Sequence, residues 1–130
     1  MASAASLKLV LTGFLLAFAA VTGSVYSKGP VEAASITTIS IAEMPAQGAQ
    51  TYRLIAQGGP FPYEKDGVVF GNRERLLPIK VRGHYREYTV KTPGLNHRGK
   101  RRIVCGGAPR TPEICYYTAD HYASFRRIVS

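Results

Sequence analysis

The chain has 130 residues with 17 Lys or Arg against eight Asp or Glu, for a formal net charge of +9. This length allows one compact domain, and the positive surplus favours polyanionic partners and disfavours cationic ones. The chain has two cysteines without a CxxC spacing, which argues against a structural zinc site.

The N-terminal stretch has the layout of a secretory signal peptide. An almost unbroken apolar run follows Lys8, and small residues come after it; a basic start and an apolar centre are typical of such signals. The run is shorter than the roughly 20 apolar residues that span a bilayer, so a membrane anchor is the less favoured alternative. Cleavage after Ala19 or after Ala33 fits the pattern. We predict a signal peptide and loose lead-in over residues 1–34 and an extracellular domain over residues 35–130.

One helix is expected near the start of the domain. Residues 24–41 are small, polar and β-branched and predict a loose lead-in. In "MPAQGAQTYRLIAQGGPFP" a helix can open at Pro45, and Tyr52 and Ile55 recur at helical spacing. Gly58 and the residues after it end the helix, which predicts one apolar face packed on a sheet.

Strand-like segments follow from Gly67 to the C-terminus. They are "GVVFGN", "GHYREYTVKTPG", "RRIVCGG", "ICYYT" and "HYASFRRIV", separated by Gly, Pro and Asn turns. Runs of this length with such turns indicate an antiparallel meander. One helix followed by several strands predicts an α+β fold, with the helix on one face of a small antiparallel sheet.

The two cysteines, Cys105 and Cys115, both fall in the predicted domain. An exported chain meets oxidising conditions, so one disulfide is the simplest interpretation; two buried free thiols are the alternative. Closing a loop this short stabilises the fold by somewhat under about 3 kcal/mol on the chain-entropy model.

Strand alternation sorts the side chains of "HYREYTVK" onto two faces. Tyr88 and Val90 form the core-facing set, and Glu87 lies beside Tyr85 on the open face. This strand therefore presents a lone carboxylate on the face away from the core.

The same rule, applied to "RGKRRIV", puts Arg98, Lys100 and Arg102 on one face and Arg101 with Ile103 on the other. One face of the sheet can then combine a carboxylate with two or three cations. Exposed salt bridges, worth about 0–1 kcal/mol each, and an anion-binding site are both compatible with this pattern.

Two further segments carry candidate chemistry. "DHY" places His121 at a strand entry, where an imidazole suits proton transfer but also serves structural roles. "FGNRE" ends an apolar strand in a loop that can offer an aromatic face, N–H groups and a carboxylate. A nucleobase is recognised by such groups.

These residues carry a family resemblance. "GGPFPYEKDGVVFGNRERLLP", "YREYTVKTPGLNHRGKRRIVCG" and "YYTADHYASFRRI" occur in order and at compatible spacing between Met44 and Ile128. They resemble the secreted bacterial guanyl-specific ribonucleases, the microbial ribonuclease family that includes barnase. The resemblance implies the fold of that family, with an N-terminal helix packed on a small antiparallel sheet.

The resemblance also implies an activity. Such enzymes cleave single-stranded RNA on the 3′ side of guanosine, through a 2′,3′-cyclic phosphate that water then opens, without a metal or another cofactor. By match to the family motif, Glu87 is the general base, His121 is the general acid, and Arg98 and Arg102 bind the phosphate.

The "FGNRE" block resembles the guanine-binding loop of the family. Glu74 is expected to accept hydrogen bonds from the guanine N1 and N2 groups, and Phe70 and Tyr122 to flank the base. Gly71 stands where relatives often carry a longer polar residue. The residues implied for guanine binding are Phe70, Gly71, Asn72, Arg73, Glu74 and Tyr122.

Two other functions remain as alternatives. One is a non-catalytic basic protein that binds RNA or another polyanion; it has no need of Glu87, since a carboxylate amid arginines weakens phosphate affinity. The other is a ribonuclease toxin with a cognate inhibitor, small, acidic and barstar-like, because an inhibitor must match the positive face. We expect a monomer without membrane association in its mature form, and His97 to be an exposed loop histidine that matters little for cleavage.

Overall fold

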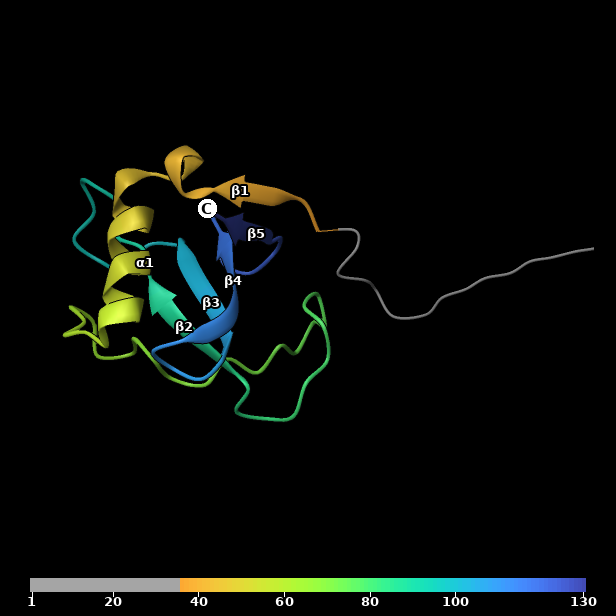
Figure 1. The fold of residues 1–130 in the computed structure, drawn as a ribbon. Helices are drawn as coiled ribbons and strands as arrows, with labels where there is room; N and C mark the ends of the chain where they lie inside the picture. The colour runs from red at the N-terminus through yellow and green to blue at the C-terminus, as the bar shows by residue number, and fades with distance from the viewer. Residues whose placement is uncertain (1–35) are drawn as a thin grey trace, which may run out of the picture.

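The computed structural model describes residues 36–130. The predicted signal peptide and both cleavage sites lie outside this range. Figure 1 shows one helix beside a twisted sheet. The elements are β1 (Thr38–Ser40), a 3-10 turn (Ile41–Glu43), α1 (Ala46–Gln57), β2 (Tyr85–Thr89), β3 (Arg102–Gly107), β4 (Pro112–Thr118) and β5 (Arg126–Val129).

The predicted helix is confirmed, with both of its ends where the sequence places them. Pro45 precedes the first turn, and Gly58 closes the last one with φ of 83°. The N–H of Gly58 donates to the carbonyl of Leu54 at 2.9 Å, so a residue without Cβ ends the helix in the left-handed conformation. Thr51 and Ile55, four residues apart, are buried and face the sheet.

The sheet has the strand order β1-β5-β4-β3-β2, and β2 to β5 form the predicted antiparallel meander. The expectation of an entirely antiparallel sheet is wrong at one edge, because β1 pairs parallel to β5. The lead-in was also predicted as loose up to residue 41, yet Ile39 pairs with Ile128 and is 3% exposed. Burying this side chain fixes the N-terminal segment beside the C-terminal strand (Figure 1).

The segment "GVVFGN" is not a regular strand, contrary to the prediction. Val69 forms an isolated bridge with Arg86, and the N–H groups of Gly67 and Phe70 donate to carbonyls of β2. Val69 is 36% exposed, whereas Phe70 packs against a core cluster, so the apolar run follows the edge of β2 and reaches the core at Phe70. The segment thereby begins a long loop whose N-terminal part is fixed to β2.

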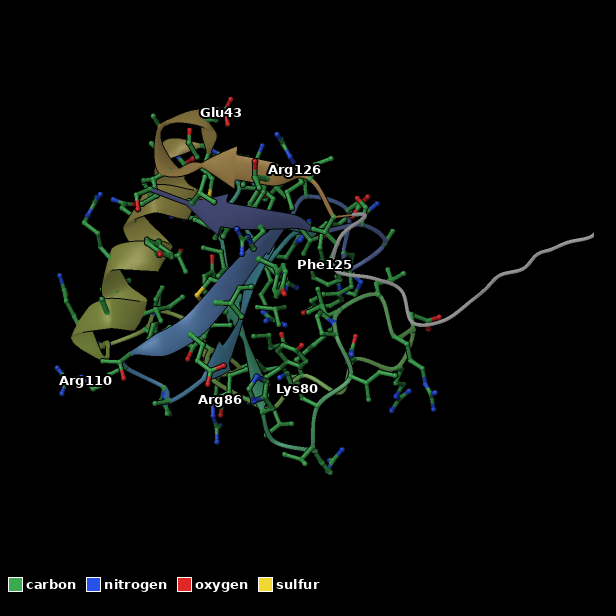
Figure 2. All side chains as sticks on the ribbon, turned by 45° about the vertical axis from the view of Figure 1, so that its right-hand side comes forward. Glu43, Lys80, Arg86, Arg110, Phe125 and Arg126 are labelled. Carbon is green, nitrogen blue, oxygen red and sulfur yellow. A yellow bond between two sulfur atoms is a disulfide. The ribbon has the colours of Figure 1, made fainter. Side chains whose placement is uncertain are left out.

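Each face of the sheet carries a separate apolar cluster. On the helix side lie Tyr88, Ile103 and Tyr117, together with the helix residue Ile55. The other face carries a second cluster, so the expectation that Tyr85 lies on an open face is wrong: it is 3% exposed. Figure 2 shows side chains filling the space between the sheet and the long loop, near Phe125. The second cluster consists of Leu77, Tyr85, Val104, Tyr116 and Phe125.

Cys105 and Cys115 are opposite residues of β3 and β4 and form the predicted disulfide. Both belong to the cluster on the helix side. The disulfide therefore joins neighbouring strands of the meander on the helix side of the sheet, and it takes up no space on the other face.

Within residues 36–130, no helix is both long enough and apolar enough to cross a membrane.

Candidate active site

Glu87 lies at the centre of a polar cluster on the sheet face away from α1. Its Oε1 atom lies 3.2 Å from Nη2 of Arg98 and 3.8 Å from Nε of Arg102. The same oxygen accepts a hydrogen bond of 2.8 Å from the hydroxyl of Tyr122. Residues from a loop, a second strand and a turn thus converge on one carboxylate oxygen of β2.

Arg102 begins β3 and is almost completely buried, with 3% of its surface exposed. Its Nη1 donates to the carbonyl of Arg101 at 2.8 Å, while its buried Nε has no hydrogen-bond partner within residues 36–130. Buried donors are normally satisfied, and a guanidinium keeps its charge in all conditions. The anionic oxygen beside this donor is Oε1 of Glu87, at 3.8 Å, which is an ion-pair contact without a hydrogen bond.

Arg98 reaches the same carboxylate from the loop before β3. Alternation correctly put Arg98 and Arg102 on one side, although β3 begins only at Arg102 and the strand rule does not extend to Arg98. Nε of Arg98 donates to Oγ1 of Thr89 at 3.0 Å while Nη2 donates to Glu87. Thr89, whose hydroxyl orients Arg98, was not among the residues predicted from the sequence. The signal that could have identified it is its position two residues after Glu87, on the same face of the strand.

His121 lies in the turn between β4 and β5 and is exposed, so its predicted place at a strand entry is wrong. Its backbone has φ of 57°, and its N–H donates to the carbonyl of Lys100 at 3.0 Å. Asp120 stabilises the turn, because its carboxylate accepts hydrogen bonds from Thr118 Oγ1 at 2.9 Å and from Ser124 Oγ at 2.7 Å. The hydrogen bond from Ser124 is the main reason that the pKa of Asp120 is lowered.

A cavity of about 440 Å³ adjoins this cluster. Glu87 and His121 line it together with Glu74, so two carboxylates and an imidazole face one space. The structure therefore brings together the predicted general base, the predicted general acid and the carboxylate predicted to bind guanine. The other residues that line the cavity are Val69, Phe70, Gly71, Asn72, Arg73, Leu76, Tyr122, Ala123 and Phe125.

The loop on one side of this cavity is held by Asn72. Its side chain donates to the carbonyl of Leu77 at 3.0 Å and accepts from the N–H of Leu77 at 3.2 Å. The backbone of Asn72 is left-handed, with φ of 51°, as Asn tolerates. Within residues 36–130, the N–H groups of Asn72, Arg73 and Glu74 have no protein acceptor and remain available for a ligand.

Phe70 and Tyr122, which are predicted to flank the base, contact each other in this structure. Their ring centroids are 4.9 Å apart and the rings are tilted by 38°. A base between two rings needs two contact layers, or about 7 Å, so none fits between them in this arrangement. Burial, and then the hydrogen bond to Glu87, raise the pKa of Tyr122 to about 12, which keeps its hydroxyl a donor.

A family model described as ribonuclease matches residues 28–129. The chain belongs to this ribonuclease family. The match includes every residue that lines the cavity, and it starts within the part of the chain that precedes the described residues.

Three curated relatives support the assignment. Guanyl-specific ribonuclease Sa of Kitasatospora aureofaciens is 50% identical over 91 residues, which cover 70% of this ribonuclease and 92% of the relative. Guanyl-specific ribonuclease St of Saccharopolyspora erythraea is 49% identical over 88 residues, 68% of this chain and 83% of the relative. Guanyl-specific ribonuclease Sa3 of K. aureofaciens is 52% identical over 94 residues, which make up 72% of this chain but only 64% of that relative.

Solved structures of ribonuclease Sa2 share the fold. One, of complexes with mononucleotides, has a TM-score of 0.69 and 46% identity over 74% of this chain and 96% of that chain. Another, with 3′-GMP, has a TM-score of 0.64 and 45% identity over 72% of this chain and 97% of that one. The α+β fold of this ribonuclease is thus the fold of its family.

Within residues 36–130, this ribonuclease has no group of three or more His, Cys, Asp or Glu side chains placed to share a metal ion.

Proposed function

We propose that this ribonuclease cleaves single-stranded RNA on the 3′ side of guanosine. The observation that carries the proposal is that Glu74, Glu87 and His121 line one cavity, and that Arg98 and Arg102 both contact Glu87. RNA supplies its own nucleophile, the 2′-hydroxyl, so the protein has to supply a base, an acid and positive charge. Glu87 is the base, His121 is the acid, and Arg98 and Arg102 supply the positive charge.

In the first reaction, the 2′-oxygen forms a bond to phosphorus as the bond from phosphorus to the 5′-oxygen breaks. Glu87 takes the proton of the 2′-hydroxyl, and His121 gives a proton to the departing 5′-oxygen. The product is a 2′,3′-cyclic phosphate. In the second reaction a water oxygen forms a bond to phosphorus as the bond from phosphorus to the 2′-oxygen breaks. His121 takes a proton from the water and Glu87 returns one to the 2′-oxygen, so the product is a 3′-phosphate and both groups are restored.

Arg98 and Arg102 stabilise the charge on the phosphorane. Both guanidinium groups contact Glu87, and their forks of N–H donors suit phosphate oxygens as well. Arg102 cannot move far, because it is buried between β2 and β4, opposite Thr89 and Thr118. A fixed charge of this kind requires little reorganisation during the reaction.

Guanine binds in the cavity beside the Asn72–Glu74 loop. Glu74 accepts from the guanine N1 and N2 hydrogens, and the free N–H groups of Asn72 and Arg73 donate to O6. Adenine has no N2 amino group and carries an amino group in place of O6, so it would leave these partners unpaired. The base stacks on the cavity side of Phe70, since no space exists between Phe70 and Tyr122.

We also propose that residues 35–130 form the mature extracellular enzyme after removal of the signal peptide, acting as a monomer without a metal. The positive charge of the chain fits an acidic proteinaceous inhibitor, if the producing cell requires protection.

Cut mapping on a short single-stranded RNA in the presence of EDTA tests the function. We expect cuts after guanosine and products that carry a 2′,3′-cyclic phosphate. An intact substrate would favour the non-catalytic RNA-binding alternative, and cuts unrelated to guanosine would remove the role given to Glu74.

A further inference from the structure

The long loop before β2 carries apolar side chains that nothing in residues 36–130 covers. Ile79 is 66% exposed and Val81 is 79% exposed, more than any other exposed large hydrophobic residue of the described chain. Residues 79–82, called the loop tip below, belong to the green loop that projects from the sheet on the side away from α1 (Figure 1). Single exposed apolar residues are common on proteins, but two side chains this exposed and this close together favour contact with an apolar phase.

Contacts on both sides of the loop tip hold it in this exposed position. Before it, Leu77 is 1% exposed and belongs to the second core cluster, and the carbonyl of Pro78 accepts from the hydroxyl of Tyr85 at 2.6 Å. After it, the N–H of His84 donates to the carbonyl of Val81 at 3.1 Å. The tip therefore lies between two fixed points, and its apolar side chains have no room to fold back into the core.

Basic side chains alternate with the apolar ones in the loop tip. Lys80, labelled in Figure 2, and Arg82 are both exposed, and neither forms an ion pair within the part of the chain that the structure describes. Residues 73–82 contain four Lys or Arg and one Glu, for a formal net charge of +3. Aliphatic side chains next to cations are typical of protein segments that lie in the interface of an anionic bilayer.

Other partners fit these features less well. Single-stranded RNA is bound through charge and by stacking of bases on aromatic rings, and the loop tip has no aromatic residue. A second copy of the chain would bring an equal positive charge against the first, which repels it. A stable protein interface buries about 800 Å² on each partner, more than a projecting tip of four residues offers.

We propose that the loop tip inserts into the headgroup region of a bilayer that contains anionic lipids. Ile79 and Val81 reach the upper acyl carbons, and Lys80 and Arg82 lie at the lipid phosphates. Residues 79–82 are absent from the lining of the guanine cavity, so the inference is independent of the catalytic roles proposed above. It departs from the expectation, drawn from the sequence, that the mature domain does not associate with membranes.

Sedimentation with lipid vesicles tests the binding. The mature domain is used, because residues 36–130 contain the whole sheet, both apolar clusters and the disulfide. We expect it to bind vesicles of phosphatidylcholine and phosphatidylglycerol in equal parts. Binding to phosphatidylcholine alone should be at least about tenfold weaker, since each basic residue near an anionic surface contributes about fivefold. Equal binding to the two lipids, or no binding to the anionic vesicles, would overturn the proposal.

Two double variants separate the apolar contribution from the charged one. Ile79→Ser with Val81→Ser should lower the partition coefficient for anionic vesicles about tenfold or more, since each CH₂ group withdrawn from the bilayer costs about fourfold. Lys80→Gln with Arg82→Gln should lower it by a similar factor. A loss in the second variant without a loss in the first would mean that the vesicles attract the charge alone, which would overturn insertion.

Matched controls come from the opposite end of β2. Leu95 is 40% exposed in the loop after that strand, and Leu95→Ser should leave the partition coefficient within about twofold, because this residue does not reach the bilayer. Arg53→Gln with Lys91→Gln removes two exposed charges beside α1 and should cost less than the pair in the loop tip, because salt screens distant charges. Losses equal to those of the loop-tip variants would exclude the tip as the docking site.

A fluorescent side chain reports insertion directly. The chain contains no tryptophan, so Val81→Trp places a single indole in the loop tip and Leu95→Trp places one elsewhere. We expect the emission of Val81→Trp alone to move to shorter wavelength when anionic vesicles are added. Poly-L-glutamate and polyadenylate should leave it unchanged, because they offer negative charge without an apolar phase. A shift with either of them would assign the tip to an acidic protein or to nucleic acid instead.

Sedimentation velocity without lipid tests the remaining occupant, a second copy of the chain. We expect the mature domain to sediment as a monomer at the concentrations used with vesicles. Self-association that is lost in Ile79→Ser with Val81→Ser would assign the loop tip to a contact between copies and would overturn the bilayer proposal. Cleavage of GpC without vesicles should be the same in that variant and in the unaltered domain, which verifies that the variant is folded.

Discussion

The hydroxyl of Tyr122 donates a hydrogen bond of 2.8 Å to Oε1 of Glu87. The two residues lie 35 positions apart in the chain, one on β2 and one in the β4–β5 turn. This contact joins the turn that carries His121 to the strand that carries the proposed base. It also explains part of the raised pKa of Tyr122.

The first prediction concerns alkaline stability. Burial raises the pKa values of Tyr85 and Tyr122 from 10.0 to about 12. Above pH 10 the unfolded chain loses these protons while the folded chain keeps them, so the free energy of unfolding falls as the pH rises from 10 to 12. Urea unfolding at fixed pH values across this range should show a decreasing midpoint. In Tyr122→Phe the urea midpoint should decrease less steeply between pH 10 and pH 12. The same steepness as in the unaltered domain would contradict the raised pKa of Tyr122.

The second prediction concerns the base. In Glu87→Gln the amide keeps the shape of the side chain and can still accept from Tyr122, but it cannot take a proton. We expect kcat for cleavage of GpC to fall by at least about 10²-fold. KM should stay the same or decrease, because a carboxylate no longer competes with phosphate for Arg98 and Arg102. A variant that keeps kcat within a few-fold, with its fold verified by circular dichroism, would exclude Glu87 as the base.

The third prediction compares two histidines. His121→Ala removes the acid of the first reaction and the base of the second, so both should lose about 10²-fold or more in kcat. His97→Ala should cost far less in the first reaction and leave the second within about twofold. Stopped assays of GpC cleavage and cyclic phosphate hydrolysis measure both values. Comparable losses from the two variants would mean that the acid is another group or is shared.

The fourth prediction concerns guanine preference. Glu74→Gln keeps the size of the side chain but replaces the charged acceptor of N1 and N2 hydrogens with an amide. Since a hydrogen bond to a charged group contributes about 1.5–3 kcal/mol, the ratio of kcat/KM for GpC to that for ApC should fall by about one to two orders of magnitude. Glu113→Gln, which neutralises an exposed glutamate of β4, is the control and should leave the ratio unchanged.

The fifth prediction concerns the disulfide. Removing it with Cys105→Ala and Cys115→Ala together should lower the free energy of unfolding by about 2–3 kcal/mol, the chain-entropy value for closing a loop with the sequence separation of 10 seen here. Urea unfolding with and without a reductant measures the effect. Reductant should destabilise the unaltered domain and leave the double variant unchanged; equal stability of the two proteins would mean that the bond contributes little.

The sequence was sufficient for features whose causes are local. The bounds of α1 follow from Pro45 and Gly58, because a cap and a left-handed glycine act on the residues beside them. Strand periodicity correctly separated Glu87 from Tyr88, since alternation is a property of the single strand. The assignment of Glu87, His121, Arg98 and Arg102 to roles came from motif resemblance and stays a prediction.

Contacts between distant segments had to come from the tertiary structure. No local pattern indicates that Thr38–Ser40 pairs parallel to β5, because that pairing depends on how the chain ends meet after folding. The burial of Tyr85 depends on Leu77 and Phe125, which reach it from the long loop and from the residue just before β5. The contact between Phe70 and Tyr122 likewise arises only when separate loops are held against one sheet.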